Sequence, residues 1–454
     1  MKHEGMPRII LVPYPAQGHV TPLLQLASSF HVHGLQPLVV LPDFIYGRIV
    51  SKIGAASGGV VFVSLPSGLG PDEPKDFFNI GYAMEHHMPS HFEDVLLSHG
   101  NDGRVVCVVV DLLASWAIDV ARRCGIPAAG FWPAMVATYH LIRAIPDLIR
   151  IGLISEHGTP LQKGLVRFLP RQPMLNPHEL PWLVGNSASA KLRFAFWLRT
   201  LQRSRSMKWL LVNSFPKGAA VGDDEDDDDD ISTLQHLPIF RIGPLIRPSK
   251  TSPTLWEEDR SCLEWLNEQP GSSVIYVSFG SWVKPIGDEK INQLALGLEA
   301  TQRPFLWVLA PVWRAGLPTG YLDRVKDRCM VAYWVPQKEV LAHEAVGCYL
   351  THCGWNSTME AIQAQKRLLC YPVSGDQFVN CRYIVKVWGI GEEIGGGTQH
   401  DVEEGVRRLM EGGGDMQRRV EELKERVMGE EASNGATSRL IAFLDVLHNR
   451  KVFV

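Results

Sequence analysis

The segment 351–360, T-H-C-G-W-N-S-T-M-E, combines polar side chains and a glycine in a pattern suited to binding an anion. It follows the apolar stretch 347–350, a predicted strand, and the spacing of its apolar residues predicts that a helix begins within it. The free N–H groups and the dipole of a helix start attract anions, and Gly354 lets the backbone approach them closely. Three side chains can add hydrogen-bond donors: His352, Asn356 and Ser357. We therefore predict a diphosphate site that needs no metal ion.

The same segment allows a purely structural interpretation. Ser357 and Glu360 stand three residues apart, so they could form a capping box that closes the helix on itself. Core packing also accounts for Trp334, which ends a predicted strand, but it does not account for the polar residues expected nearby. These residues favour the anion site: Gln337, Asp376 and Gln377.

His19 and Asp111 are placed where they could form a general base. His19 follows a predicted strand, 9–14, and precedes a helix that Thr21 is expected to cap, with Pro22 at its first position. Asp111 directly follows six apolar residues, and a carboxylate there is costly unless it is paired. Both residues thus lie at the carboxyl ends of predicted parallel strands, where α/β proteins bind their ligands.

The predicted pair has a clear chemical use. A helix start disfavours imidazolium, while Asp111 orients the ring of His19 and stabilises it once it has accepted a proton. His19 could therefore deprotonate an acceptor hydroxyl as a general base. Asp119 is an alternative partner, but it lies eight residues further along, on the expected following helix.

The elements around these residues predict two doubly wound α/β domains. A chain of 454 residues exceeds what one hydrophobic core usually supports, and each half contains strand, helix and strand in the order of a parallel sheet. Between the halves lies a stretch rich in proline, serine and threonine. The expected organisation is an N-terminal domain at 1–244, a linker at 245–258, a C-terminal domain at 259–435, and a last helix at 436–454 that packs back on the N-terminal domain.

Composition excludes several classes of protein. The formal net charge is −4, and the acidic run 223–230, which we interpret as a solvated loop without function, carries eight acidic residues, so the rest of the chain is about +4. Neither the net charge of −4 nor the +4 of the remainder suggests a nucleic-acid partner. The longest apolar stretch, 105–118, contains Asp111, and the start of the chain resembles no signal peptide, so we expect a cytoplasmic protein without a membrane span. Eight singly spaced cysteines predict reduced thiols in the core.

The stretch 334–377 closely resembles the signature box of plant secondary-product UDP-glycosyltransferases. It contains W-V-P-Q-K-E-V-L-A-H, then G-C-Y-L-T-H-C-G-W-N-S-T-M-E, and it ends in D-Q. The motifs P-Y-P-A-Q-G-H-V-T-P, L-V-N-S-F, I-G-P-L, C-L-E-W-L and V-I-Y-V-S-F-G-S follow the order of that family, so the likeness covers nearly the whole chain. Two stretches, L-L-A-S-W-A-I-D-V-A and F-G-S-W-V-K-P-I-G, are most similar to its 82A subgroup.

The resemblance implies a GT-B fold of two Rossmann-like domains facing a cleft, an acceptor-binding N-terminal domain and a donor-binding C-terminal domain. It also implies an inverting transfer, for which His19 and Asp111 match the family's base and its partner. It implies a UDP-sugar as co-substrate, no other cofactor and no metal. The sugar is expected to be glucose, because glutamine at the last position of the family's box goes with glucose. The implied donor contacts are Trp334 and the Val335 backbone on uracil, Gln337 and Glu360 on ribose, Ser281, His352, Asn356 and Ser357 on the diphosphate, and Trp355, Asp376 and Gln377 on the hexose.

One departure from the family box concerns local stability. Where the family has Gly-Val-Pro, this chain has Gln365, Lys366 and Arg367. If Gln365 adopts a left-handed conformation, the cost is roughly 1 kcal/mol.

The acceptor does not follow from the sequence. Its pocket is expected among loops at 77–88, 131–145 and 180–196, whose largely apolar side chains suit a phenolic, terpenoid or hormone-like compound.

Three other functions are weaker. A non-catalytic protein that binds a UDP-sugar or another small ligand would not need both His19 and Asp111. A metalloprotein could use His343, His352 and Cys353, but their spacing matches no common zinc site. A dinucleotide-dependent oxidoreductase would need G-x-G-x-x-G after the first strand, where this chain has P-A-Q-G-H.

Overall fold

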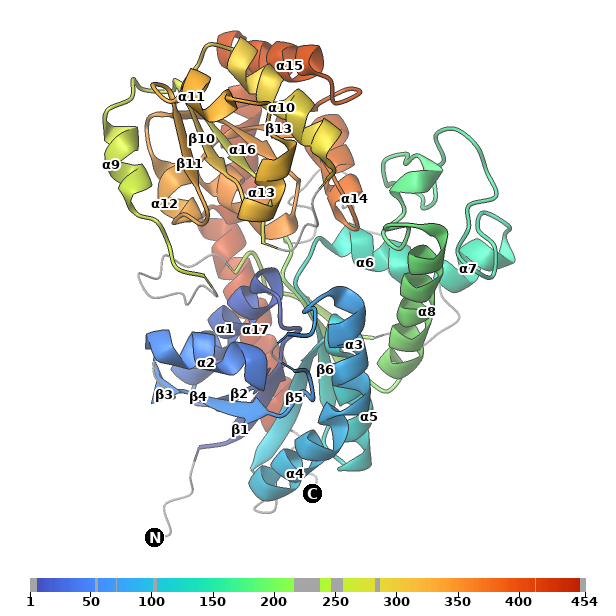
Figure 1. Cartoon of the computed structure of the whole chain (residues 1–454). Helices are drawn as coiled ribbons and strands as arrows, with labels where there is room; N and C mark the ends of the chain where they lie inside the picture. Colours follow the sequence, from blue (N-terminus) through green and yellow to red (C-terminus); the bar gives the residue numbers. More distant parts are fainter. Residues whose placement is uncertain are drawn as a thin grey trace.

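The strands of the computed structural model form two sheets, each with helices packed around it (Figure 1). The structure describes residues 6–53, 56–70, 72–100, 104–215, 237–245, 256–281, 286–412 and 414–449. The acidic run at 223–230 and most of the predicted linker lie outside the described residues. Strand pairing is parallel throughout except between the two strands at one edge of the larger sheet, which confirms the predicted α/β class with two doubly wound domains.

The N-terminal sheet has eight strands in the order β3-β4-β2-β1-β5-β6-β7-β8. The strands are β1 (Arg8–Val12), β2 (Gln36–Pro42), β3 (Ala56–Ser57), β4 (Val60–Leu65), β5 (Val105–Asp111), β6 (Ala128–Trp132), β7 (Trp209–Val212) and β8 (Ile239–Arg241). The helices are α1 (Gln17–Val32), α2 (Asp43–Ile53), α3 (Phe77–His86), α4 (Met88–Gly100), α5 (Trp116–Arg123), α6 (Val136–Arg143), α7 (Ile145–Arg150) and α8 (Ser187–Ser204), with 3₁₀ turns η1 (Leu112–Ala114) and η2 (Pro177–Glu179).

The C-terminal sheet has six strands in the order β11-β10-β9-β12-β13-β14. The strands are β9 (Val274–Ser278), β10 (Phe305–Val308), β11 (Cys329–Ala332), β12 (Val346–Thr351), β13 (Arg367–Cys370) and β14 (Gly391–Glu393). The helices are α9 (Ser261–Asn267), α10 (Asp288–Ala300), α11 (Tyr321–Val325), α12 (Gln337–Ala342), α13 (Trp355–Gln363), α14 (Gln377–Arg382), α15 (Gln399–Glu411), α16 (Gly414–Met428) and α17 (Glu430–Asn449), with η3 (Pro311–Gly316) and the π-helical turn η4 (Tyr383–Val387).

The N-cap of helix α1 lies five residues before Thr21, so the prediction that Thr21 caps this helix is wrong. Ala16 is the N-cap residue in an extended conformation, and its carbonyl accepts the backbone N–H groups of His19 and Val20. The chain can turn there because a helix start needs no side-chain cap when neighbouring groups satisfy its N–H donors. His19 therefore lies in the first turn of α1, and Pro22 lies inside the helix.

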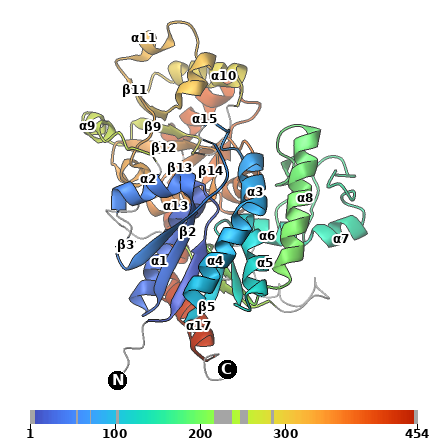
Figure 2. The same cartoon turned by 60° about the horizontal axis from the view of Figure 1, so that its bottom comes forward.

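Helix α17 begins at Glu430, earlier than the predicted last helix, and crosses from the C-terminal domain to the N-terminal one. Figures 1 and 2 show it (red) descending beside the N-terminal sheet. Phe443 is fully buried there, with ring centroids 6.1 Å from Phe30 and 5.7 Å from Trp209. Arg439 Nε also donates to the Arg241 carbonyl at 2.8 Å. The domain boundaries drawn from the sequence stay predictions.

The cysteines carry free thiols, and most of them are buried. All eight cysteines are free thiols, but Cys124 and Cys329 are partly exposed, so the prediction that every cysteine lies in the core is wrong for these two. Within the described ranges, none of the helices combines the length and the apolar character needed to span a bilayer.

Candidate active site

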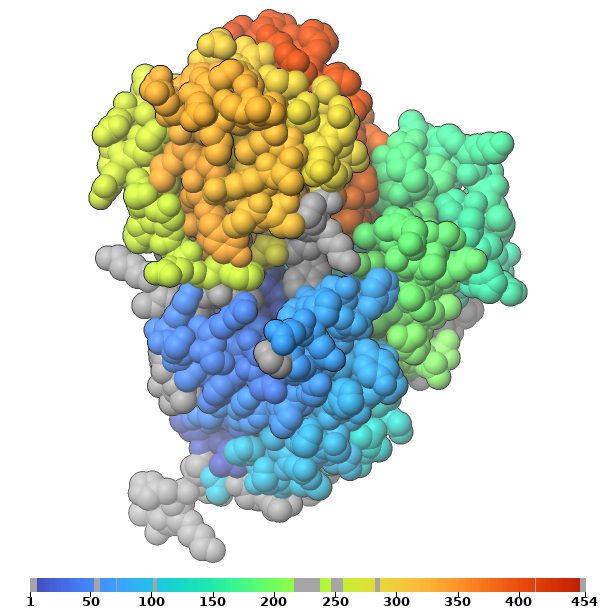
Figure 3. All heavy atoms as spheres, viewed as in Figure 1, coloured from blue at the N-terminus to red at the C-terminus, as the bar shows by residue number. Residues whose placement is uncertain are grey.

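A chamber of about 2050 Å³ lies between the two domains, at the carboxyl ends of both sheets. Figure 3 shows the C-terminal domain (yellow to red) above the N-terminal domain (blue), with α6 to α8 (green) beside the junction. Every residue predicted from the sequence to bind donor or to act as the base lines this chamber. Its volume exceeds the roughly 300–1,000 Å³ of a typical small-molecule site, which is consistent with two substrates bound together.

His19 and Asp111 meet in this chamber as predicted from their places after strands. Strands β1 and β5 are parallel neighbours, so the residues that follow them emerge at one edge of the sheet. His19 Nδ1 lies 2.7 Å from Asp111 Oδ2, and the other carboxylate oxygen accepts the Leu113 backbone N–H at 2.9 Å. Asp111 is fully buried, while a quarter of the His19 side chain is exposed. With Nδ1–H donated to Asp111, Nε2 keeps its lone pair for a proton from a substrate.

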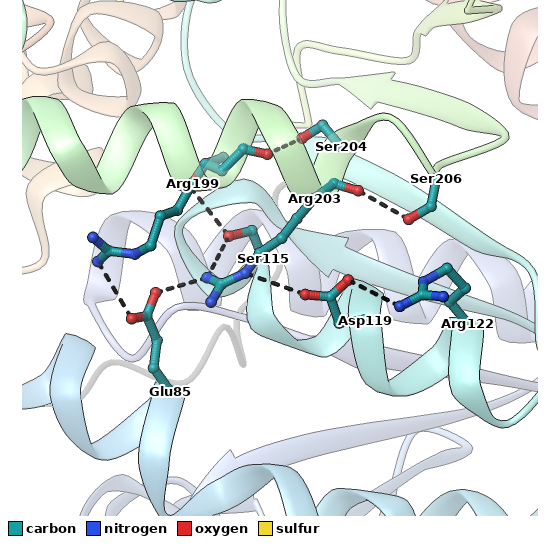
Figure 4. A network of polar contacts seen from close by, with 9 residues as sticks. Glu85, Ser115, Asp119, Arg122, Arg199, Arg203, Ser204 and Ser206 are labelled. Carbon is teal, nitrogen blue, oxygen red and sulfur yellow. Dashed lines mark hydrogen bonds and ion pairs between the residues drawn. The ribbon is translucent and has the colours of Figure 1, made fainter.

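Asp119 is not an alternative partner for His19. Figure 4 shows it on α5 in a separate network, where Arg203 Nε lies 3.4 Å and Arg122 3.9 Å from its carboxylate. The eight-residue offset places it on a helix that faces α8 rather than at the strand end. The same network joins Glu85 to Arg203 at 2.7 Å.

His352 is held as a neutral ring beside the expected diphosphate position. It is 7% exposed, and burial lowers its pKa to about 4. The ring fits because two glycines flank it: a Cβ on Gly354 would lie 2.4 Å from Nε2, and one on Gly280 would lie 2.7 Å away. Cys353, next in the chain, has a φ of +66°, a backbone conformation that the sequence did not reveal. This turn leads into the start of α13.

The start of α13 differs from the predicted capping box. Gly354 is the N-cap residue, so Ser357 lies within the helix and does not cap it. Instead, Gln337 Nε2 donates to Ser357 Oγ at 3.0 Å and to Glu360 Oε2 at 2.8 Å. Burial raises the pKa of Glu360, and Lys338 and the Gln337 amide oppose that rise.

Gln337 is already occupied by protein partners, which bears on its predicted contact with ribose. Its Oε1 accepts the hydroxyl groups of Tyr276 at 2.9 Å and Tyr349 at 3.3 Å, and its Nε2 donates as described above. The Gln337 side chain therefore positions Glu360 and Ser357. Of the two predicted ribose contacts, Gln337 and Glu360, the carboxylate of Glu360 is the better placed to accept ribose hydroxyls.

Two predicted donor residues instead link the domains. The indole N–H of Trp355 donates to the Asn213 carbonyl at 2.7 Å, so it is not available to the hexose. Asn356 Nδ2 donates to the Gly18 carbonyl at 2.7 Å. That carbonyl is free because Pro22, four residues further along α1, has no N–H to donate to it. The start of α13 and the start of α1 are thus joined across the chamber.

Asp376 and Gln377 lie at the start of α14, and their contacts limit what each can offer a sugar. Burial raises the pKa of Asp376, while the Asn380 amide and the charge of His19 oppose the rise, so Asp376 and His19 interact across the chamber. Gln377 Oε1 accepts the backbone N–H groups of Val373 and Ser374, each at 2.9 Å. Its amide nitrogen is therefore the group left for the hexose, and the expectation that it offers both a donor and an acceptor is wrong.

The departure from the family box is accommodated locally. Gln365 has a φ of +56°, as expected for a turn without glycine. Lys366 Nζ donates to the carbonyls of Val346 at 2.7 Å and His343 at 3.1 Å, and Arg367 donates to the Gly412 carbonyl at 2.8 Å. These bonds support the loop.

The acceptor side is formed by helices where the sequence led us to expect loops. Segments 77–88, 131–145 and 180–196 contain much of α3, α6 and α8, and they place Phe77, Ile80, Thr138, Ile142 and Arg193 on the chamber wall. The lining residues that the prediction missed include Trp197 of α8, Tyr14, whose ring centroid is 5.5 Å from that of His19, and Trp256, whose ring centroid is 6.4 Å from that of Trp334. Aromatic side chains are equally common in hydrophobic cores, so their residue type alone did not indicate that they line the chamber.

A cluster of thiols is the one group of potential metal ligands found among the described residues. The sulfur atoms of Cys353, Cys370 and Cys381 lie within 4.8 Å of one another, in the layer beneath the chamber. The set considered from the sequence does not assemble, because His343 contacts Asn267 and its own turn.

Comparisons with known proteins agree with this geometry. Residues 255–417 match the family model described as UDP-glucoronosyl and UDP-glucosyl transferase. UDP-glycosyltransferase 82A1 of Arabidopsis thaliana is 50% identical, with 95% of this chain and 96% of the relative covered. Flavonol 3-O-glucosyltransferase UGT76E12 of the same plant is 32% identical, with 94% of each chain covered.

A solved structure supports the fold. That of Medicago truncatula UGT71G1 complexed with UDP-glucose superposes with a TM-score of 0.79 at 25% identity, covering 98% of each chain. The two parallel-sheet domains and the chamber between them are thus arranged as in a GT-B enzyme.

Proposed function

This chain belongs to the plant UDP-glycosyltransferases, and on that premise we propose that it transfers glucose from UDP-glucose to a hydroxyl group of a small apolar acceptor, inverting the anomeric carbon. The observation that carries the proposal is the His19–Asp111 pair, which lines the same chamber as the donor residues. In relatives the donor is UDP-glucose, as the name of the Medicago truncatula complex states.

The reaction follows from the position of the base. His19 Nε2 removes the proton of the acceptor hydroxyl as its oxygen attacks the anomeric carbon, and UDP leaves from the opposite face. Asp111 stabilises the resulting imidazolium through its bond to Nδ1. The start of α13, with Ser281, His352 and Ser357, holds the departing diphosphate. We propose that this needs no divalent ion.

On the donor side, Trp334 stacks on uracil and the Val335 backbone pairs with its edge, while Glu360 binds ribose. Asp376 accepts hydrogen bonds from hexose hydroxyls, and the Gln377 amide donates to one. Asn356 can reach the diphosphate only by leaving the Gly18 carbonyl. We propose that the acceptors are phenolic, terpenoid or hormone-like and that the protein acts in the cytoplasm.

Two assays test the proposal. A library of hydroxylated compounds incubated with UDP-glucose, and read by mass spectrometry, should yield a product heavier by one hexose residue. Binding of UDP-glucose without transfer to any compound would indicate a binding protein instead. For an accepted compound, UDP-glucose should compete successfully against UDP-galactose, UDP-xylose and UDP-glucuronic acid, and a preference for another donor would refute the glucose assignment.

A further inference from the structure

Arg193 is a cation on the acceptor side of the chamber, a side that Lys75 and Asp76 also line. It extends from α8 and lines the chamber together with Phe77 of α3. Its guanidinium carbon lies 4.0 Å from the ring centroid of Phe77 and 5.3 Å from that of Phe78. Figures 1 and 2 both show α8 beside α3, and the contacts of Arg193 with Phe77 and Phe78 connect these two helices.

The guanidinium of Arg193 has no anionic partner among the residues that the structure describes. None of the ion pairs within 4 Å in that part of the chain involves it, and its buried Nε has no hydrogen-bond partner. Asp76 is the nearest acid to influence it, but one oxygen of that carboxylate caps α3 by accepting the N–H groups of Phe78 and Asn79, each at 3.0 Å. Burial lowers the pKa of Arg193, although arginine keeps its charge in proteins.

Such a side chain is costly unless something completes its contacts. Removing a charged group from water is unfavourable, and contact with the rings of Phe77 and Phe78 offsets only part of that cost. The neighbouring arginines on α8 are paired: Arg199 and Arg203 both contact Glu85 (Figure 4). Arg193 differs from them in facing the chamber, where a bound molecule can supply the missing acceptor atoms.

We propose that Arg193 forms an anion subsite that holds a carboxylate of the acceptor while the acceptor's hydroxyl reaches His19. This rests on the proposed glucosyl transfer. The wall between the two positions is aromatic: Tyr14 contacts His19 with ring centroids 5.5 Å apart, and it contacts Phe77 at 6.3 Å. An acceptor that fills the chamber therefore has a hydroxyl at one end, an apolar body and a carboxylate at the other. The preferred substrate class is hydroxy acids, glucosylated on oxygen of the hydroxyl group.

Matched pairs of acceptors test this directly. Para-hydroxybenzoic acid, para-hydroxycinnamic acid and a long-chain ω-hydroxy acid are each compared with their methyl esters, which keep the hydroxyl and the body but lose the charge. The wild-type enzyme should use at least one acid with a kcat/KM about 10- to 100-fold above its ester, the range of a hydrogen bond to a charged group. The product should resist mild alkali, because an O-glucoside does so and a glucose ester does not.

Variants then locate the preference. Arg193→Gln and Arg193→Met should remove the advantage of the acid and leave transfer to the ester within a few-fold of wild type. Methionine keeps an apolar stem on Phe77, so the two variants separate the charge from packing. Lys191→Gln, a change of the same charge at an exposed position on α8, should keep the preference.

The inference and the proposed function fail in different ways. Transfer to esters without any preference for acids, a preference that survives in both Arg193 variants, or a glucose ester as the product would overturn the carboxylate subsite alone. No transfer to any hydroxylated compound would overturn the proposed function and, with it, the subsite.

Discussion

Replacing Asp111 by asparagine should disable His19 while leaving the shape of the site intact. The buried carboxylate accepts two hydrogen bonds, one from His19 Nδ1 and one from the Leu113 backbone N–H. Asparagine has a single oxygen, so one of these donors must face an NH₂ group. If the amide oxygen stays with Leu113, its NH₂ donates to His19 Nδ1 and moves the ring proton to Nε2, where the base needs a lone pair.

The expected size follows from these contacts. Losing the charge-assisted bond to the imidazolium costs about 1.5–3 kcal/mol, and the mismatched donor adds about 1–3 kcal/mol. A combined loss of roughly 3–5 kcal/mol corresponds to about two to four orders of magnitude in kcat.

The assay compares Asp111→Asn with Asp119→Asn, using UDP-glucose and one accepted compound. Asp119 pairs with Arg203 and Arg122 on a partly exposed surface, so its variant should keep kcat within about threefold. UDP binding, measured by calorimetry, should be unchanged in both, because the donor residues belong to the other domain. A near-normal rate for Asp111→Asn, or an equal loss in Asp119→Asn, would refute the assignment of the base.

Four further predictions concern the base, the donor site, the need for a metal ion and the buried His352. His19→Ala should lower turnover by about two to four orders of magnitude while UDP still binds, and normal turnover would exclude it as the base. Gln377→Ala should reduce kcat/KM for UDP-glucose by at least roughly 5- to 150-fold, since the hydrogen bond to the hexose is lost together with those that the amide oxygen accepts from the Val373 and Ser374 N–H groups; an unchanged value would contradict the hexose contact. Activity should persist in excess chelator, and loss that magnesium restores would argue for a metal. The pKa of His352, about 4, lies below its value of about 6.5 in the unfolded chain, so the stability of the folded state should fall as pH decreases through that interval. Denaturant titrations test this: between about pH 7.5 and 5.5, the free energy of unfolding should fall by about 1 kcal/mol more in the wild type than in His352→Gln.

The arrangement of the base could be predicted because it depends on topology. A parallel sheet brings the carboxyl ends of its strands to one edge, and the runs before His19 and Asp111 identified those strands. The predicted phosphate site rests on a strand, a glycine and a helix start in sequence, and the structure has β12, Gly354 and α13 in that order. These features need no knowledge of side-chain partners.

What the sequence could not reveal is the set of partners contributed by distant segments. Trp355 and Gln337 stay predicted donor contacts, but the indole N–H of the first donates to the Asn213 carbonyl and the amide oxygen of the second accepts the Tyr276 hydroxyl. The cap assigned to Thr21 was wrong because a proline usually marks the first turn of a helix, whereas Pro22 lies in its interior. Local spacing cannot show which polar groups a fold has already satisfied.

The residues at positions 22 and 356 should covary among related sequences. An ordinary residue at position 22 would supply the N–H that closes the helix at Gly18, leaving no free carbonyl for Asn356 to hold. A change of Asn356 would in turn leave that carbonyl without its partner from the other domain. Selection acting on either site is therefore conditioned on the other, and we expect covariation between two positions separated by most of the chain.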